Sequence, residues 1–104
     1  MKNTYIEILN ENKALDICSL DVSQLSSMTE NMVICTATSN RHGKSLANKL
    51  VEKAKDMGNQ PLGVEGLDEA SWILIDLNNV IVHIMLADTR KYYQLEKLWT
   101  HPSQ

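Results

Sequence analysis

The sequence contains few of the residues that build metal centres, redox motifs or cofactor-binding loops. Its two cysteines, Cys18 and Cys35, lie in apolar runs outside any CxxC motif, which argues against a zinc site or a redox dithiol. Neither GxGxxG nor GxxxxGK[ST] occurs, so the signatures of dinucleotide and phosphate loops are missing. We therefore expect free thiols, as in a reducing cytosol, and neither a metal nor a cofactor.

Long apolar segments are also missing. Residues 1–10 hold one lysine and no extended apolar run, which predicts neither a signal peptide nor a membrane span. We expect a cytoplasmic protein without membrane contact. A chain of 104 residues without repeats or low-complexity segments has the usual size of one domain, so residues 1–104 are predicted to form a single compact unit.

Basic residues are absent between Lys55 and Arg90. This stretch instead holds six acidic residues, namely Asp56, Glu65, Asp68, Glu69, Asp76 and Asp88. Such a surface would attract a basic protein and repel a phosphate backbone, and a formal net charge of -3 gives no general drive toward nucleic acid. We expect no dedicated nucleic-acid site. Five basic residues precede this stretch and are interpreted as the solvated face of a helix: Arg41, Lys44, Lys49, Lys53 and Lys55.

Hydrophobic periodicity and turn residues predict alternating helices and strands. Three helices are expected. The first spans 5–14 after a capping box at Thr4 and Glu7, and the second is capped by Ser39 or Asn40 and followed by Gly58 at its C′ position. The third is capped by Asp88 or Thr89 and has an apolar side made of Tyr92, Leu95, Leu98 and Trp99. Five strands are expected: 17–22, a central one at 32–38, 62–64, and a hairpin within 72–86. Residues 25–29 are expected to be a connector.

The hairpin register follows from a two-residue turn at Asn78–Asn79, for which asparagine favours type I′. Pairing outward from this turn places Leu77, Ile75 and Ile73 on one aliphatic face with Val80, Val82 and Ile84. The other face carries Trp72, Leu74, Asp76, Ile81, His83 and Met85. This mixture of aromatic, thioether and polar groups is typical of a recognition surface. Alternatively, a helix covers this face and Trp72 belongs to the core.

The sequence offers only weak candidates for catalytic residues. His83 alternates with apolar residues in a strand and is interpreted as a structural histidine rather than a general base. His42, in a basic loop at 41–44, could contact a phosphate at a helix N-terminus. Glu65 and Asp76 could form a carboxylate pair across adjacent strands, but no substrate pocket accompanies them.

Several segments occur together in the order and spacing of one known family. They are Asp16-Ile17, Leu20–Val22, Val33-Ile34, Thr38–His42, Val64–Gly66, Trp72–Asp76, Val80–His83 and Arg90–Trp99. Over nearly its whole length the chain resembles the bacterial ribosome-silencing factor, or Iojap-like, family. It departs from the family at Asn78–Asn79, where Gly-Asp is usual, so one acidic group beside the hairpin is missing.

The resemblance implies an α/β fold with a mixed sheet of about five strands and three flanking helices, related to nucleotidyltransferases but without their catalytic Gly-Ser and paired-Asp signature. It implies a non-enzymatic translational repressor that binds the large ribosomal subunit through ribosomal protein number fourteen. Binding would block subunit joining when nutrients are scarce. The residues expected to contact this basic partner are Trp72, Met85, Glu65, Asp68, Glu69, Asp76 and Tyr93. Alternatives are a nucleotide-binding or nucleotidyl-transferring enzyme using loop 41–44, and a homodimeric interaction module.

Overall fold

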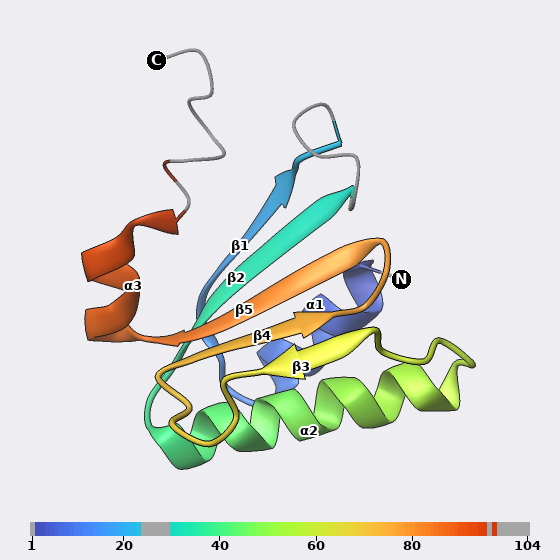
Figure 1. The fold of residues 1–104 in the computed structure, drawn as a ribbon, viewed down its shortest axis with the longest axis horizontal. Coiled ribbons are helices and arrows are strands. Elements are labelled where there is room, and N and C mark those ends of the chain that lie inside the picture. Colours follow the sequence, from blue (N-terminus) through green and yellow to red (C-terminus); the bar gives the residue numbers. More distant parts are fainter. Residues whose placement is uncertain (1, 24–29, 96, 98–104) are drawn as a thin grey trace.

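Five strands form one mixed sheet in the computed structural model, which describes residues 2–23, 30–95 and 97 (Figure 1). The elements in chain order are α1 (Lys2–Glu11), β1 (Leu15–Asp21), β2 (Asn31–Ala37), α2 (Asn40–Asp56), β3 (Gly63–Glu65), β4 (Trp72–Asp76), β5 (Val80–Leu86) and α3 (Ala87–Tyr93). Across the sheet the strand order is β1-β2-β5-β4-β3. The predicted α/β class, five-stranded mixed sheet and three helices are confirmed.

Strands β2 and β5 run parallel, and the other three neighbouring pairs are antiparallel. The predicted hairpin register is confirmed, because Ile75 pairs with Val82 and Ile73 with Ile84. The predicted type I′ geometry of the turn was wrong. Asn78 has a positive φ of 74°, but Asn79 is not among the residues with positive φ, whereas type I′ requires positive φ at both turn residues.

Helices α1 and α2 cover one face of the sheet (Figure 1), and the main core lies between them and the strands. Leu46, Leu50 and Ala54 of α2 are fully buried there. Ser39 is the N-cap of α2 and accepts a hydrogen bond from the His42 backbone N–H at 3.0 Å, and Gly58 follows with φ of 76°. The five basic residues before the acidic stretch are all exposed, so their interpretation as a solvated surface is confirmed.

Helix α1 lies three residues earlier than predicted, over Lys2–Glu11. Thr4 is therefore inside the helix and is not its cap. Tyr5 and Leu9, one turn apart, are fully buried and fix this face against the sheet. Lys13, with φ of 67°, lies in the left-handed region and reverses the chain into β1.

Helix α3 also differs from the prediction. Its N-cap is Leu86, which makes no side-chain capping bond, so neither Asp88 nor Thr89 caps it. Tyr92 is 80% exposed and is not part of an apolar side, while Leu95 is partly buried against a small cluster that includes Ile34 and Met85. The predictions for the connector at 25–29 and for Leu98 and Trp99 lie outside the described residues.

Candidate functional site

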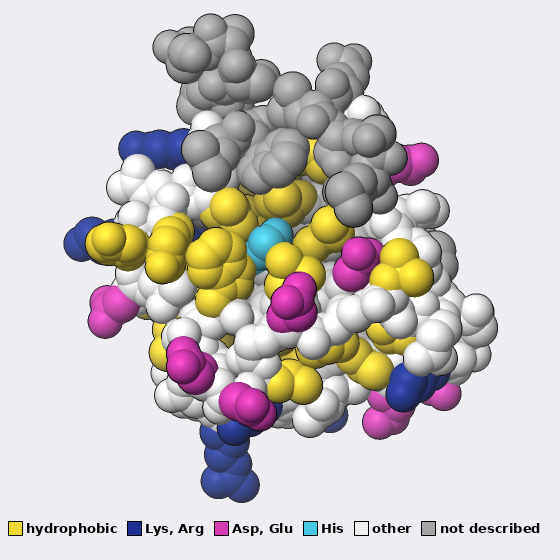
Figure 2. Space-filling model, viewed as in Figure 1, with side chains coloured by type: hydrophobic (Ala, Val, Ile, Leu, Met, Phe, Trp, Pro, Cys, Tyr) yellow, Lys and Arg dark blue, Asp and Glu magenta, His cyan; other side chains and the backbone are white. Residues whose placement is uncertain are grey.

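The sheet face opposite α1 and α2, here called the open face, carries the side chains that the sequence singled out. Figure 2 shows hydrophobic side chains gathered around a histidine on this side of the molecule, with acidic side chains beside them. Trp72, Leu74, Asp76 and Ile81 are half-buried there. Strand alternation places them here because the residues between them, such as Ile73 and Ile75, pack into the main core.

Trp72 is held by two aromatic neighbours. Its Nε1–H donates a hydrogen bond to Nδ1 of His83 at 2.9 Å. Its ring lies 4.8 Å from the ring of Tyr93, at an interplanar angle of 50°, within the separation at which aromatic pairs stabilise each other. The indole therefore sits on the open face in a fixed orientation, which lowers the entropy lost when a partner binds.

His83 is a buried, neutral histidine. Only 5% of the residue is exposed, and burial lowers the pKa of the imidazole to about 4. Because Nδ1 accepts the Trp72 hydrogen bond, the ring proton lies on Nε2. This supports the interpretation of His83 as a structural group.

An acidic loop borders Trp72. Asp68 and Glu69 are exposed and line a groove of about 560 Å³ together with Gly66, Ser71 and Trp72. The loop is tied down by backbone hydrogen bonds from Ala70 N–H to the Gly66 carbonyl, 2.8 Å, and from Leu86 N–H to the Ser71 carbonyl, 3.0 Å. Asn40 of α2 donates a further bond to the Glu69 carbonyl at 2.6 Å. The two carboxylates thus stand on a braced loop next to an aromatic ring.

The structure brings most of the predicted contact residues together and removes one. Trp72 and Tyr93 are in contact, and Asp68 and Glu69 line the groove beside Trp72. Met85 is a correction: its side chain is fully buried in a small cluster with Val22, Met32 and Ile34. A partner cannot reach it without opening that cluster.

Glu65 and Asp76 do not form the carboxylate pair that the sequence suggested. Glu65 is exposed and pairs with Leu74, whereas Asp76 is half-buried and pairs with Gly63. They are therefore not directly opposite each other, and the suggested carboxylate pair is not formed. Asp76 instead accepts a hydrogen bond from the Asn78 backbone N–H at 3.1 Å and stabilises the hairpin turn.

The described part of the chain offers little to catalysis or metal binding. No group of three or more His, Cys, Asp or Glu side chains there could hold a metal ion. His42 uses both ring nitrogens internally, toward Thr38 and the Asn12 carbonyl, which removes it as a phosphate ligand. Burial raises the pKa of the Cys35 thiol to about 12 although the nearby Arg90 opposes the shift, so this thiol is unreactive. No described helix is long and apolar enough to cross a membrane.

Sequence reasoning missed the groove and the role of Arg90. Arg90 reaches from α3 to the Thr36 hydroxyl at 2.9 Å and to the Asp16 carbonyl. These contacts join residues 54 and 74 positions apart, and no local pattern reveals them. Gly66 was the one available signal for the groove, since its positive φ of 86° shapes the loop entry.

Fold and site define an α/β domain with an aromatic, acid-bordered face, a surface suited to recognising a protein. The family model described as "Ribosomal silencing factor during starvation" matches residues 1–104. A relative from Haemophilus influenzae, named ribosomal silencing factor RsfS, is 47% identical over 94 residues, covering 90% of this chain and 92% of that protein. The chain belongs to the ribosomal silencing factor family, whose members are regulators of translation rather than enzymes.

Two further similarities support the assignment. A crystal structure of a protein from Chromobacterium violaceum superimposes with a TM-score of 0.91 at 41% identity, over 94% of this chain and 82% of that chain. A mouse protein named mitochondrial assembly of ribosomal large subunit protein 1 is 34% identical over 98 residues, covering 91% of this chain and 43% of that protein.

Proposed function

We propose that this protein silences ribosomes by binding the large subunit through ribosomal protein number fourteen, a basic protein, and by blocking the joining of the small subunit when nutrients are limited. The observation that carries the proposal is the fixed Trp72 ring beside the carboxylates of Asp68 and Glu69. The mouse relative's name refers to the large ribosomal subunit, which supports this choice of subunit. The site of action is the cytoplasm.

The groove beside Trp72 suits a lysine or arginine side chain of the partner. A cation there would lie against an aromatic face and near two carboxylates, and each of these interactions favours a positive charge. Glu65, exposed on the neighbouring strand β3, adds to the same negative potential. Complementary charge would speed encounter, and the desolvated indole would anchor the complex.

Blocking by simple obstruction requires a rigid body of sufficient size. The molecule measures 37 × 31 × 22 Å, and a sheet whose strands are all hydrogen-bonded to neighbours resists deformation. A domain of these dimensions, seated on a protein at the subunit interface, would keep the small subunit from approaching. No catalytic step is needed.

The test is binding of purified large subunits by Trp72→Ala, compared with wild type and with Met57→Ala. Met57 is 39% exposed at the end of α2, on the opposite layer of the molecule. We expect Trp72→Ala to lose about 2 kcal/mol or more of binding free energy and Met57→Ala to bind normally. Binding of ribosomal protein number fourteen alone should fall in parallel.

Because Trp72 is half-buried, its truncation also removes packing, so urea unfolding must accompany the binding assay. Tyr93→Ala, which truncates a side chain of a residue that is 51% exposed, probes the same surface at smaller risk to the fold. Full subunit binding by both variants would contradict the proposal. If both variants instead abolish self-association in solution while subunit binding persists, the open face serves a homodimer.

A further inference from the structure

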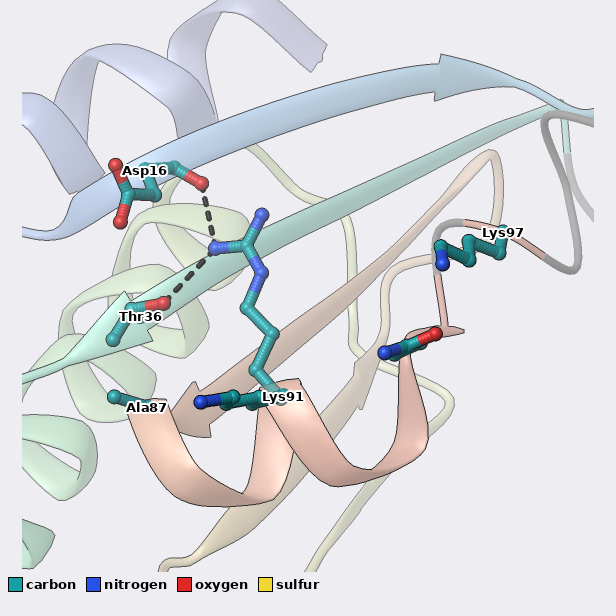
Figure 3. A pocket seen from close by; sticks show the side chains of 7 residues that line it. Asp16, Thr36, Ala87, Lys91 and Lys97 are labelled. Carbon is teal, nitrogen blue, oxygen red and sulfur yellow. Dashed lines mark hydrogen bonds between the residues drawn. The ribbon is translucent and has the colours of Figure 1, made fainter.

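A second pocket lies on the β1–β2 side of the Trp72–Tyr93 contact. It has a volume of about 320 Å³ and is formed where α3 meets β1 and β2 (Figure 3). Its polar lining consists of Asp16, Thr36, Arg90, Lys91, Gln94 and Lys97. The proposed contact with a ribosomal protein uses none of these residues.

The pocket is positive in a protein that is negative overall. Three of its lining residues are cations and one is a carboxylate, whereas the whole chain has 10 basic and 13 acidic residues. Figure 3 shows the Asp16 carboxylate turned away from the hydrogen-bonded guanidinium, toward which only the Asp16 carbonyl points. Within the described residues no ion pair engages Lys91 or Lys97. An anion would therefore lower the repulsion between these charges.

The fold fixes one of the cations at the wall of the pocket. Nη1 of Arg90 donates hydrogen bonds to the Asp16 carbonyl at 2.6 Å and to the Thr36 hydroxyl at 2.9 Å. The Asp16 carbonyl faces α3 because the β1–β2 register shifts between Leu15 and Cys18, where Asp16 has φ of 48°. The guanidinium is thus oriented by the sheet before any ligand arrives.

The chain then returns toward the pocket after α3. Gln94, with φ of 47° and ψ of 48°, ends the helix in the left-handed conformation. Its backbone N–H bonds the Arg90 carbonyl at 2.9 Å, and Lys97 N–H bonds the Gln94 carbonyl at 3.0 Å. This turn brings Lys97 to the same pocket as Lys91 (Figure 3).

We propose that this pocket binds a phosphate of the RNA backbone of the large ribosomal subunit. The inference rests on the proposed function, because the RNA in question belongs to the same large subunit that the open face is proposed to bind. A ribosomal protein is surrounded by RNA, and α3 carries both Tyr93, which contacts Trp72, and two of the cations that line the pocket. Lysine and arginine are the usual partners of backbone phosphates. This proposal departs from the sequence-based expectation of no dedicated nucleic-acid site, because the sequence becomes basic again at Arg90 and Lys91.

The experiment compares Lys91→Ala/Lys97→Ala with Lys49→Ala/Lys53→Ala, which removes the same charge from the exposed face of α2. Arg90 is left intact because it bridges α3 and the sheet. Three probes are used: purified large subunits, protein-free large-subunit RNA, and ribosomal protein number fourteen alone. Affinity is measured at several salt concentrations.

We expect the pocket variant to bind subunits and RNA more weakly, with the slope of log K against log salt reduced by about one per lysine removed. Its affinity for the isolated ribosomal protein should not change, and the α2 variant should match wild type throughout. An equal loss in both variants would overturn the proposal, because binding would then reflect overall charge. Unchanged subunit binding by the pocket variant would overturn it too.

The remaining outcomes separate the two proposals. If wild type binds RNA through these lysines but ignores the ribosomal protein, the pocket is supported and the proposed function fails. If the pocket variant loses affinity for the isolated ribosomal protein instead, the pocket recognises protein and the RNA assignment fails. Inorganic phosphate is added at constant ionic strength, at the same concentration as the phosphate groups of the RNA. It should not displace the RNA; if it does, the ligand is free phosphate.

Discussion

Replacing His83 by leucine should release the Trp72 ring from its fixed position on the open face. Leucine can fill the buried site but offers no acceptor to the indole N–H, which in the wild type donates to Nδ1 of His83 at 2.9 Å. Leaving such a donor without a partner in a half-buried site costs about 1–3 kcal/mol. We expect a loss of this size in the free energy of unfolding, and weaker binding of the large subunit because the anchor must be ordered again.

His83→Asn is the matched control. The Oδ1 atom of asparagine occupies the place of Nδ1, so the Trp72 hydrogen bond can be kept. Trp72→Phe provides the other half of a double-mutant cycle, because phenylalanine has no N–H to satisfy. In the Trp72→Phe background, His83→Leu should lower the free energy of unfolding by less than it does in wild type, with a coupling free energy of about 1 kcal/mol. Urea unfolding and subunit binding both report it.

The pH dependence gives an independent check. Burial lowers the pKa of His83 to about 4 in the folded protein, against about 6.5 in an unfolded chain. The unfolded state therefore binds more protons between these values, so stability is full above about pH 6.5 and is lost as pH falls toward 4. A pKa shift of this size corresponds to about 3 kcal/mol of stability, and His83→Asn should lack this contribution. The reasoning would be refuted if the coupling free energy between positions 72 and 83 were zero and the stability of His83→Asn had the same pH dependence as that of wild type.

Three further predictions concern the main core, the glycine at the start of the acidic loop and the two carboxylates of that loop. Ile75→Ala, in the main core, should cost about 2–4 kcal/mol in the free energy of unfolding, and an unchanged urea midpoint would contradict its burial. Gly66→Ala should destabilise the protein by at least about 1 kcal/mol more than Gly58→Ala, because both have positive φ but only at Gly66 would a Cβ overlap a backbone carbonyl oxygen of β4; equal melting temperatures would argue against that overlap. Reversing Asp68 and Glu69 to lysine should slow association with the large subunit, and the wild-type on-rate should fall with salt as the Debye length shortens from about 8 Å. Stopped-flow rates that are insensitive to both changes would show that the loop is only a solvated surface.

The hairpin was predictable because its information is local. Two asparagines mark the turn, and aliphatic residues alternate from Ile73 to Ile84, so a slip of one residue would expose the whole core face. Helix α2 was predictable for the same reason, with a capping Ser39 and a terminal Gly58. The start of α1 was not, because Thr4 and Glu7 have the spacing of a cap, yet the burial of Tyr5 and Leu9 sets the helix position.

The distinction between Trp72 and Met85 was beyond a single sequence. Both alternate onto the open face and pair directly across β4 and β5. Met85 is buried in a cluster with Val22, Met32 and Ile34, which come from distant parts of the chain. Periodicity identifies the face of a strand, but it cannot tell which part of that face other segments cover.

Helix α3 shows how the open face and the basic pocket depend on each other. Its Tyr93 contacts Trp72 of β4, and its Arg90 bonds to residues of β1 and β2. No capping side chain anchors its first turn, and seven residues form too short a helix to be stable alone. Its position therefore depends on contacts such as these two, on the backbone hydrogen bond from Leu86 to Ser71 and on its covalent link to β5. A change that loosens Arg90 should shift Tyr93 as well, so the aromatic anchor and the cationic pocket are set by one small element.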